Sequence, residues 1–209
     1  MYKYFKPVAD RLAAGLGLLV LLPLLGLLAA LAYLGGLRPV LFWQQRTGYL
    51  GQPFWVLKLR TMTQRTDASG QLLPDAQRLT RLGRLLRRTS LDELPQLWNI
   101  LRGELSLVGP RPLLHAYLPL YSARQARRFL VRPGLTGWAQ VNGRNAISWE
   151  EKFEFDNQYV DQQSLAFDLR ILWRTAGQVL GRRGVAAAGE ATMSRFQGSA
   201  ALGPPPAQS

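Results

Sequence analysis

An uncharged stretch near the start of the chain constrains its fold more than any other feature. Residues 12–34 form a run of 23 positions without Asp, Glu, Lys or Arg. As an α-helix rising about 1.5 Å per residue, this run is long enough to cross a hydrocarbon layer of about 30 Å. We therefore expect residues 1–37 to form a membrane anchor.

Three topologies are compatible with this stretch. It can be a straight span, a re-entrant helix that turns back within the membrane, or a signal peptide cleaved near the small residues 30–32. Pro23 removes a backbone hydrogen bond at the centre of the run and tends to kink a helix there. The positive-inside rule places basic flanks on the cytoplasmic side. Both flanks are basic, through Lys3, Lys6, Arg11, Arg38, Arg46, Lys58 and Arg60. These two observations favour the re-entrant helix, with the other topologies left open.

The charge balance indicates an anionic partner. The chain has 26 Lys and Arg against 13 Asp and Glu, a net charge of +13, which suits nucleic acid, a phosphorylated substrate or lipid headgroups. It has no cysteine and one histidine, His115, so disulfides, thiolate metal sites and histidine-based zinc sites are excluded. Acid–base and metal chemistry therefore falls mainly on the 13 carboxylates.

Beyond the anchor, the patterns predict a mainly α-helical domain with a small β-hairpin, an α+β fold spanning residues 38–185. Residues 42–62 indicate a strand or hairpin, and residues 66–74 a polar loop. Helices are expected over 75–88, after Ser90, after Ser148 and over 165–180; the two serines each begin a Ser-x-x-Glu capping box. The basic amphipathic helices 75–88 and 165–180 suit a membrane surface. Residues 186–209 read as a partly disordered extension.

Asp92 and Glu93 are adjacent carboxylates at the predicted start of a helix. Neighbouring side chains on a helix diverge by about 100°, so the two cannot do the same task. One can face a substrate while the other holds a metal or caps the helix. A helix N-terminus favours an ionised Asp and a bound phosphate, and a carboxylate can attack phosphorus to form an acyl phosphate. The structural alternative is that Glu93 caps its own helix and Asp92 complements the helix dipole.

Loops rich in Gly and Pro present arginines downstream. Glycine lets backbone N–H groups approach an anion, and arginine binds phosphate oxygens with two hydrogen bonds. These loops centre on Arg111, Arg132 and Arg144. Each alone is more often structural, but three in succession indicate a phosphate site.

In this order, the motifs resemble the bacterial sugar transferase family, the monotopic phosphoglycosyl transferases. The resemblance runs from about residue 6 to residue 198. It is carried by KLRTM (58–62), RRTSLDELPQL (87–97), SLVGPRP (106–112) and RPGLTGWAQVNGRN (132–145). The end of the chain, with Phe196, is similar to the small enzymes that handle bacillosamine-type sugars.

The resemblance implies a covalent transfer reaction on the cytoplasmic face of the bacterial inner membrane. A UDP-sugar would give its sugar phosphate to undecaprenyl phosphate, with release of UMP. Asp92 would be the nucleophile and Glu93 would serve Mg²⁺, with Asp92 close to the metal. Lys58, Arg87, Arg111, Arg144 and Asp156 match family positions near the phosphates. The family usually pairs a Ser with the Pro of the helix break, whereas Leu22 precedes Pro23 here, so the bend angle stays open.

Two rival hypotheses remain beside this one. In the first, the same transfer is direct, with Asp92 as a metal ligand or base. In the second, the chain is a non-catalytic, membrane-anchored basic module that binds anionic lipid or nucleic acid. The chain lacks a recognisable nucleic-acid motif, so we expect membrane lipids and no nucleic acid as partners. The transferred sugar and the oligomeric state, a homodimer included, are not determined by the sequence.

Overall fold

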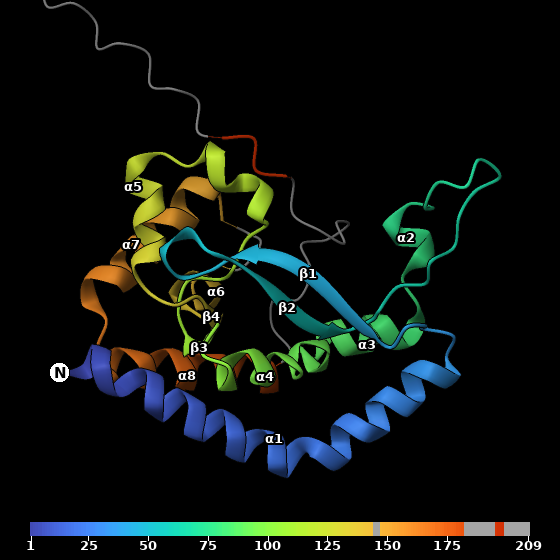
Figure 1. Cartoon of the computed structure of the whole chain (residues 1–209), viewed down its shortest axis with the longest axis horizontal. Coiled ribbons are helices and arrows are strands. Elements are labelled where there is room, and N and C mark those ends of the chain that lie inside the picture. Colours follow the sequence, from blue (N-terminus) through green and yellow to red (C-terminus); the bar gives the residue numbers. More distant parts are fainter. Residues whose placement is uncertain (144–146, 182–194, 199–209) are drawn as a thin grey trace, which may run out of the picture.

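The computed structural model describes residues 1–143, 147–181 and 195–198. Helices of very different length surround two small sheets (Figure 1). The α-helices are α1 (Tyr2–Leu34), α2 (Asp75–Arg78), α3 (Arg81–Arg88), α4 (Gln96–Leu101), α5 (Ala123–Ala126), α6 (Trp138–Val141), α7 (Trp149–Gln162) and α8 (Leu165–Leu180). Short 3-10 turns are η1 (Tyr49–Gly51), η2 (Leu91–Glu93), η3 (His115–Leu120) and η4 (Arg127–Leu130). The predicted mainly helical α+β class is confirmed.

Two pairs of strands make up the sheets. β1 (Leu41–Thr47) and β2 (Pro53–Leu59) form the predicted hairpin, an antiparallel pair in which Leu41 faces Leu59 and Thr47 faces Pro53. β3 (Ser106–Val108) and β4 (Gly134–Thr136) are parallel. This second pair joins two loop regions that the sequence left separate.

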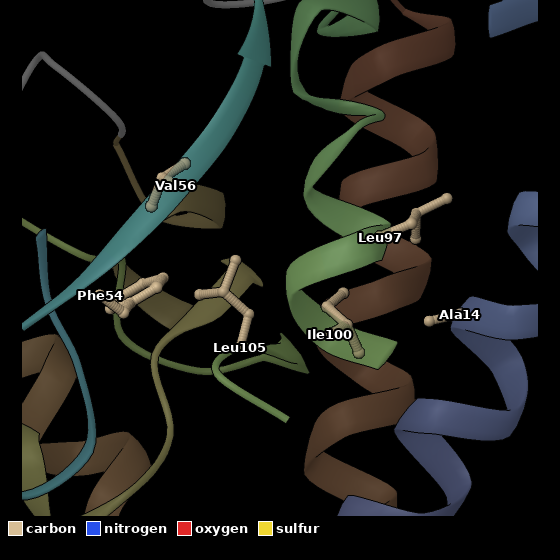
Figure 2. Close-up of a cluster of buried hydrophobic side chains, with 6 residues drawn as sticks. All are labelled: Ala14, Phe54, Val56, Leu97, Ile100 and Leu105. Atoms are coloured by element: carbon tan, nitrogen blue, oxygen red, sulfur yellow. The ribbon is translucent and has the colours of Figure 1, made fainter. Parts of the chain in front are cut away.

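Helix α1 is the one helix within the described ranges that is long and apolar enough to cross a membrane. It contains Pro23 and bends visibly near its middle (Figure 1). Both arms of the bent helix pack on the rest of the chain. Ala14 lies in a cluster with Leu97 and Ile100 of α4 (Figure 2), and Leu28 packs with Leu59 and Leu86.

A buried polar network fixes the first arm of α1. The Lys6 ammonium lies 2.5 Å from Asp168 of α8 and 3.3 Å from Asp10. Asp10 in turn accepts a 2.5 Å hydrogen bond from Ser106 of β3, while Asp168 accepts one of 2.8 Å from Tyr159 of α7. The signal-peptide topology does not fit this arrangement, because cleavage would remove Lys6, the cation paired with the buried Asp168, and Asp10, which accepts from Ser106.

The helix predicted over residues 75–88 is wrong in one respect: it is two helices. Leu79 is extended and pairs with Met62, and Thr80 caps α3 by accepting a 2.9 Å hydrogen bond from the Gly83 backbone. The bridge to Met62 satisfies backbone groups that a continuous helix would have used internally. A polar N-cap then restarts the helix at Arg81.

The last two predicted helices are confirmed. Ser148 and Glu151 exchange the two hydrogen bonds of a capping box at the start of α7. Helix α8 has the bounds expected, and its apolar stripe is exposed, with Leu165, Leu169 and Trp173 facing outward while Asp168 and Ile171 are buried. The extension 186–209 lies largely outside the described residues, but Phe196 is buried against Leu113 and Phe153.

Candidate functional site

Asp92 and Glu93 lie in the η2 turn between α3 and α4, and the capping box expected at Ser90 is not formed. Ser90 has a left-handed backbone (φ 57°), whereas a capping residue needs an extended one. Helix α4 begins only at Gln96, after Pro95. The prediction was wrong because the Glu93 side chain is committed to partners elsewhere in the fold.

Glu93 is held by two cations. Its Oε1 atom lies 2.7 Å from the Lys58 ammonium and 2.6 Å from Nη2 of Arg111. A second Arg111 hydrogen bond, of 3.3 Å, reaches Oε2. Burial alone would raise the pKa of Glu93, but the charges of Arg111 and Lys58 outweigh it and hold that pKa well below its usual range. Glu93 is therefore a fixed anion at neutral pH.

Asp92 has the opposite character. Its side chain is buried, yet within the described residues the carboxylate makes no hydrogen bond or ion pair. Burial and the neighbouring charge of Glu93 raise its pKa, and the more distant charges of Lys58, Arg87 and Arg111 only partly offset this. A carboxylate in this setting is unpaired and poorly solvated, as a nucleophile or base requires.

Arg111 is positioned by the parallel strand pair. The loop after β3 packs directly on the loop before β4: Gly134 donates a 2.9 Å hydrogen bond to the Pro110 carbonyl. A Cβ atom at Gly109 would lie 2.3 Å from the Arg132 carbonyl oxygen, so this close approach requires glycine. The Arg111 side chain keeps 42% of its surface exposed. Its guanidinium can therefore contact a ligand as well as Glu93.

Asp156 is connected to the carboxylate pair indirectly, through Arg128 and the loop that carries Arg111. It is buried against Arg128 of η4, at 2.9 Å, and Arg128 donates a 2.6 Å hydrogen bond to the backbone carbonyl of Arg111. Burial raises the pKa of Asp156 to about 6, against the opposing charges of Arg128 and Lys152. The Asp156–Arg128 pair thus supports the loop that carries Arg111.

The remaining predicted site residues are more scattered. Arg87 donates a 3.0 Å hydrogen bond to Thr61 Oγ1, and its charge reaches Asp92. Arg144 lies outside the described residues. Pro23 lies in α1 with its side chain exposed.

Sequence reasoning missed Arg46 and Arg128 as members of the site. Arg46 is on β1, where the hairpin register places it on the same face as Lys58, and its charge acts on Arg111. Only the register of the hairpin could have indicated this, because the sequence alone does not fix which β1 residues share a face with Lys58.

The carboxylates of the site suit a metal ion that is bound mainly through its phosphate substrate. Within the described residues there is no cluster of three or more Asp, Glu, His or Cys side chains able to hold a metal ion. Asp92 and Glu93 are two adjacent carboxylates, and Mg²⁺ characteristically binds through one or two carboxylates, substrate phosphates and water. The residues therefore fit Mg²⁺ only in company with a phosphate ligand.

Comparisons with known proteins point in one direction. The profile of the bacterial sugar transferase family matches residues 1–182. A relative from Bacillus subtilis, "Uncharacterized sugar transferase EpsL", is 58% identical over 77% of this chain and 80% of its own length. The "UDP-glucose:undecaprenyl-phosphate glucose-1-phosphate transferase" of Caulobacter vibrioides is 46% identical over 84% of this chain and 69% of its own. The "UDP-galactose-lipid carrier transferase" of Erwinia amylovora is 39% identical over 87% of this chain, which spans only 42% of that protein.

Proposed function

The chain belongs to the bacterial sugar transferase family, and from this membership we propose that it moves a sugar phosphate from a UDP-sugar to undecaprenyl phosphate. The products are undecaprenyl-diphosphate-sugar and UMP. Relatives are named for this reaction with glucose as the sugar, and another is named for galactose. The anionic substrates suit a chain of net charge +13.

The proposed reaction has two steps through Asp92. A carboxylate oxygen of Asp92 attacks the phosphorus that bears the sugar, the bond from that phosphorus to the UMP oxygen breaks, and UMP leaves. The sugar phosphate is then held on Asp92 as an acyl phosphate. In the second step an oxygen of undecaprenyl phosphate attacks the same phosphorus, which forms the lipid diphosphate and frees the Asp92 carboxylate.

The contrast between the two adjacent carboxylates carries this proposal. Glu93 is paired with Lys58 and Arg111, so it cannot also serve as a nucleophile. Within the described residues Asp92 has no such partner, and its charge is destabilised by burial and by Glu93. Lys58 and Arg111 in turn offer positive charge to the phosphates of the donor. Of these two carboxylates, Asp92 is therefore the one that we assign as the nucleophile.

Mg²⁺ belongs to the proposal as a substrate-linked ion. Glu93 and Asp92 would hold it together with the donor phosphates. When bound, it neutralises charge on the phosphates and so favours attack by an anion. The protein's own residues orient the donor, through Lys58, Arg111 and, by its place in the family motif, Arg144.

We further propose that the chain works at the cytoplasmic face of the bacterial inner membrane, with α1 as a re-entrant helix. Both arms of α1 contact the same body of the protein, through Ala14 and through Leu28. A straight span would carry one of these arms to the far side of the bilayer. The exposed apolar stripe of α8 suits the membrane interface.

Release of UMP from a panel of UDP-sugars tests the function. The wild-type protein in detergent is incubated with Mg²⁺ and each donor, with and without undecaprenyl phosphate. We expect release that depends on one or a few sugars, begins before lipid is added, and is lost in Asp92→Asn. Asp161→Asn, which changes an exposed aspartate paired with Arg127, is the matched control and should retain activity.

Capture of labelled sugar phosphate separates the covalent mechanism from direct transfer. The wild type, quenched in acid after exposure to donor labelled in the sugar, should carry the label, and Asp92→Asn should not. An Asp92→Asn protein that still turns over would exclude the covalent step. If no UDP-sugar is used while binding to anionic vesicles is intact, the non-catalytic membrane module is the better description.

A further inference from the structure

Arg46 is near enough to Glu93 for the two charges to interact, but among the described residues it forms no ion pair with Asp92 or Glu93. It is partly buried on the inner face of the hairpin, where Nη1 lies 3.4 Å from the Pro112 carbonyl oxygen and Nη2 lies 2.5 Å from Gln44 Oε1. Pro112 directly follows Arg111, so the Arg46 guanidinium contacts the loop that presents the Arg111 side chain.

The charges around Arg46 are unbalanced. Lys58 and Arg111 share the single carboxylate of Glu93, and within the described ranges no carboxylate pairs with Arg46. Its pKa is lowered to about 10, by burial and then by the charge of Arg111, with Glu93 opposing. A partly buried guanidinium without an anion bears an uncompensated desolvation cost, which a bound anion would offset.

We infer that Arg46 is a binding residue for the diphosphate group of the donor and contacts it beside Arg111. The inference rests on the proposed function for the identity of the donor. Two features of the geometry point to this ligand: Arg111 retains exposed surface next to Arg46, and the neutral acceptors Gln44 and Pro112 leave the charge of Arg46 unmatched. A guanidinium pairs well with phosphate oxygens, through parallel N–H donors.

The same chemistry could serve the phosphate of the lipid acceptor, and the two half-reactions separate these sources. Exchange of labelled UMP into UDP-sugar, without lipid, reports the donor step alone. The full reaction at saturating donor reports the KM for undecaprenyl phosphate. We expect Arg46→Gln to raise the donor KM about tenfold or more, the usual scale for a lost charge-assisted contact, with the lipid KM unchanged.

Matched variants distinguish binding from general charge or folding effects. Arg65→Gln removes the same charge from an exposed residue just before the 66–74 loop and should leave both KM values unchanged. Arg46→Lys retains the charge without the planar fork and should recover part of the donor affinity. A positioning role for Arg46, through the Pro112 carbonyl, would instead lower kcat at unchanged donor KM and would overturn the inference.

A binding measurement without turnover completes the test. Inorganic pyrophosphate with Mg²⁺ should raise the melting temperature of the wild type and of Arg65→Gln, and raise it much less for Arg46→Gln. An equal rise in all three, or an effect of Arg46→Gln confined to the lipid KM, would overturn the inference. If the wild type uses no UDP-sugar, the proposed function fails, and the pyrophosphate shift then decides alone whether Arg46 binds the diphosphate class of anion.

Discussion

At the scale of single residues, two neighbouring carboxylates acquire opposite properties from their surroundings. Glu93 meets Lys58 and Arg111 within 2.7 Å, which stabilises its charged form. Asp92 is buried next to the Glu93 charge and meets no cation directly, which destabilises its charged form. Two neighbouring acids whose pKa values are shifted in opposite directions are typical of an active site, where one residue reacts and the other positions its surroundings.

The raised pKa of Asp92 predicts the acidic limit of activity. Because burial favours the protonated form of Asp92, the ionised carboxylate that the proposed mechanism requires disappears as pH falls through a value above the ordinary aspartate pKa of about 3.9. Glu93 stays ionised over that range, since its pKa is lowered. The rate of UMP release at low donor concentration should therefore fall on the acid side as a single limb, with its midpoint above the ordinary aspartate pKa.

The same limb should respond to Arg87. The charge of Arg87 lowers the pKa of Asp92, so Arg87→Gln should move the acid limb to higher pH. Arg84→Gln, which removes an exposed charge from the same helix, is the control and should leave the midpoint in place. A limb that stays at the wild-type pH in Arg87→Gln would show that Asp92 does not set it.

At the scale of elements, identical local patterns have different outcomes. The chain contains Ser-x-x-Glu twice, and only the copy at Ser148 forms a capping box. At Ser90 the glutamate bonds to Lys58 and Arg111 instead, the serine is left-handed, and the residues between them form a 3-10 turn. The tertiary ion pairs override the local capping preference because Lys58 and Arg111 offer Glu93 two full positive charges, whereas a cap offers it one neutral backbone N–H.

Stability measurements should separate the two serines. Ser148→Ala removes a side chain that accepts a hydrogen bond from the Glu151 backbone, so we expect the free energy of unfolding to fall by about 1 kcal/mol. Ser90→Ala removes no capping bond and should change it much less. Chemical denaturation in detergent, followed by circular dichroism, gives both values; equal losses would contradict the assignment of the two turns.

At the scale of the whole molecule, the bent helix α1 and helix α8 lie on the same side of the protein (Figure 1). Arg170 and Arg174 flank this stripe, and both lie against Trp138. Trp173 has 81% of its surface exposed, among Leu165 and Leu169. Exposed apolar residues next to a helix that is long and apolar enough to cross a membrane, rimmed by arginines, suit an interface between bilayer and water.

Tryptophan fluorescence in brominated lipid tests this surface. Bromine near the headgroup end of the acyl chains should quench Trp173, so Trp173→Phe should lower the quenched fraction of the total signal. Trp149 packs between Tyr117, Phe153 and Phe196 inside the protein, and Trp149→Phe should leave the quenched fraction equal or higher. Equal quenching in the wild type and Trp173→Phe would place α8 away from the bilayer.

Patterns that depend on local chemistry were visible in the sequence. The length and apolarity of α1, the hairpin around residues 42–62, the bounds of α8 and the cap at Ser148 follow from periodicity, length and short-range hydrogen bonding. The motifs also indicated the carboxylates, and Lys58 and Arg111 as their neighbours. The break at Leu79 was missed, since it depends on pairing with Met62 across the chain.

The sequence by itself determined which groups this protein has to work with: one apolar helix, a large surplus of cations, two adjacent acids and no thiolate or histidine cluster. Only the tertiary structure decided how these groups differ. The parallel pairing of β3 with β4 brings Arg111 to Glu93, the hairpin register brings Arg46 to the same site, and Asp92 is left unpaired among the residues that the structure describes. The physical reason is that a pKa or an ion pair depends on burial and on charges within a few ångströms, and these contacts join residues far apart in the chain.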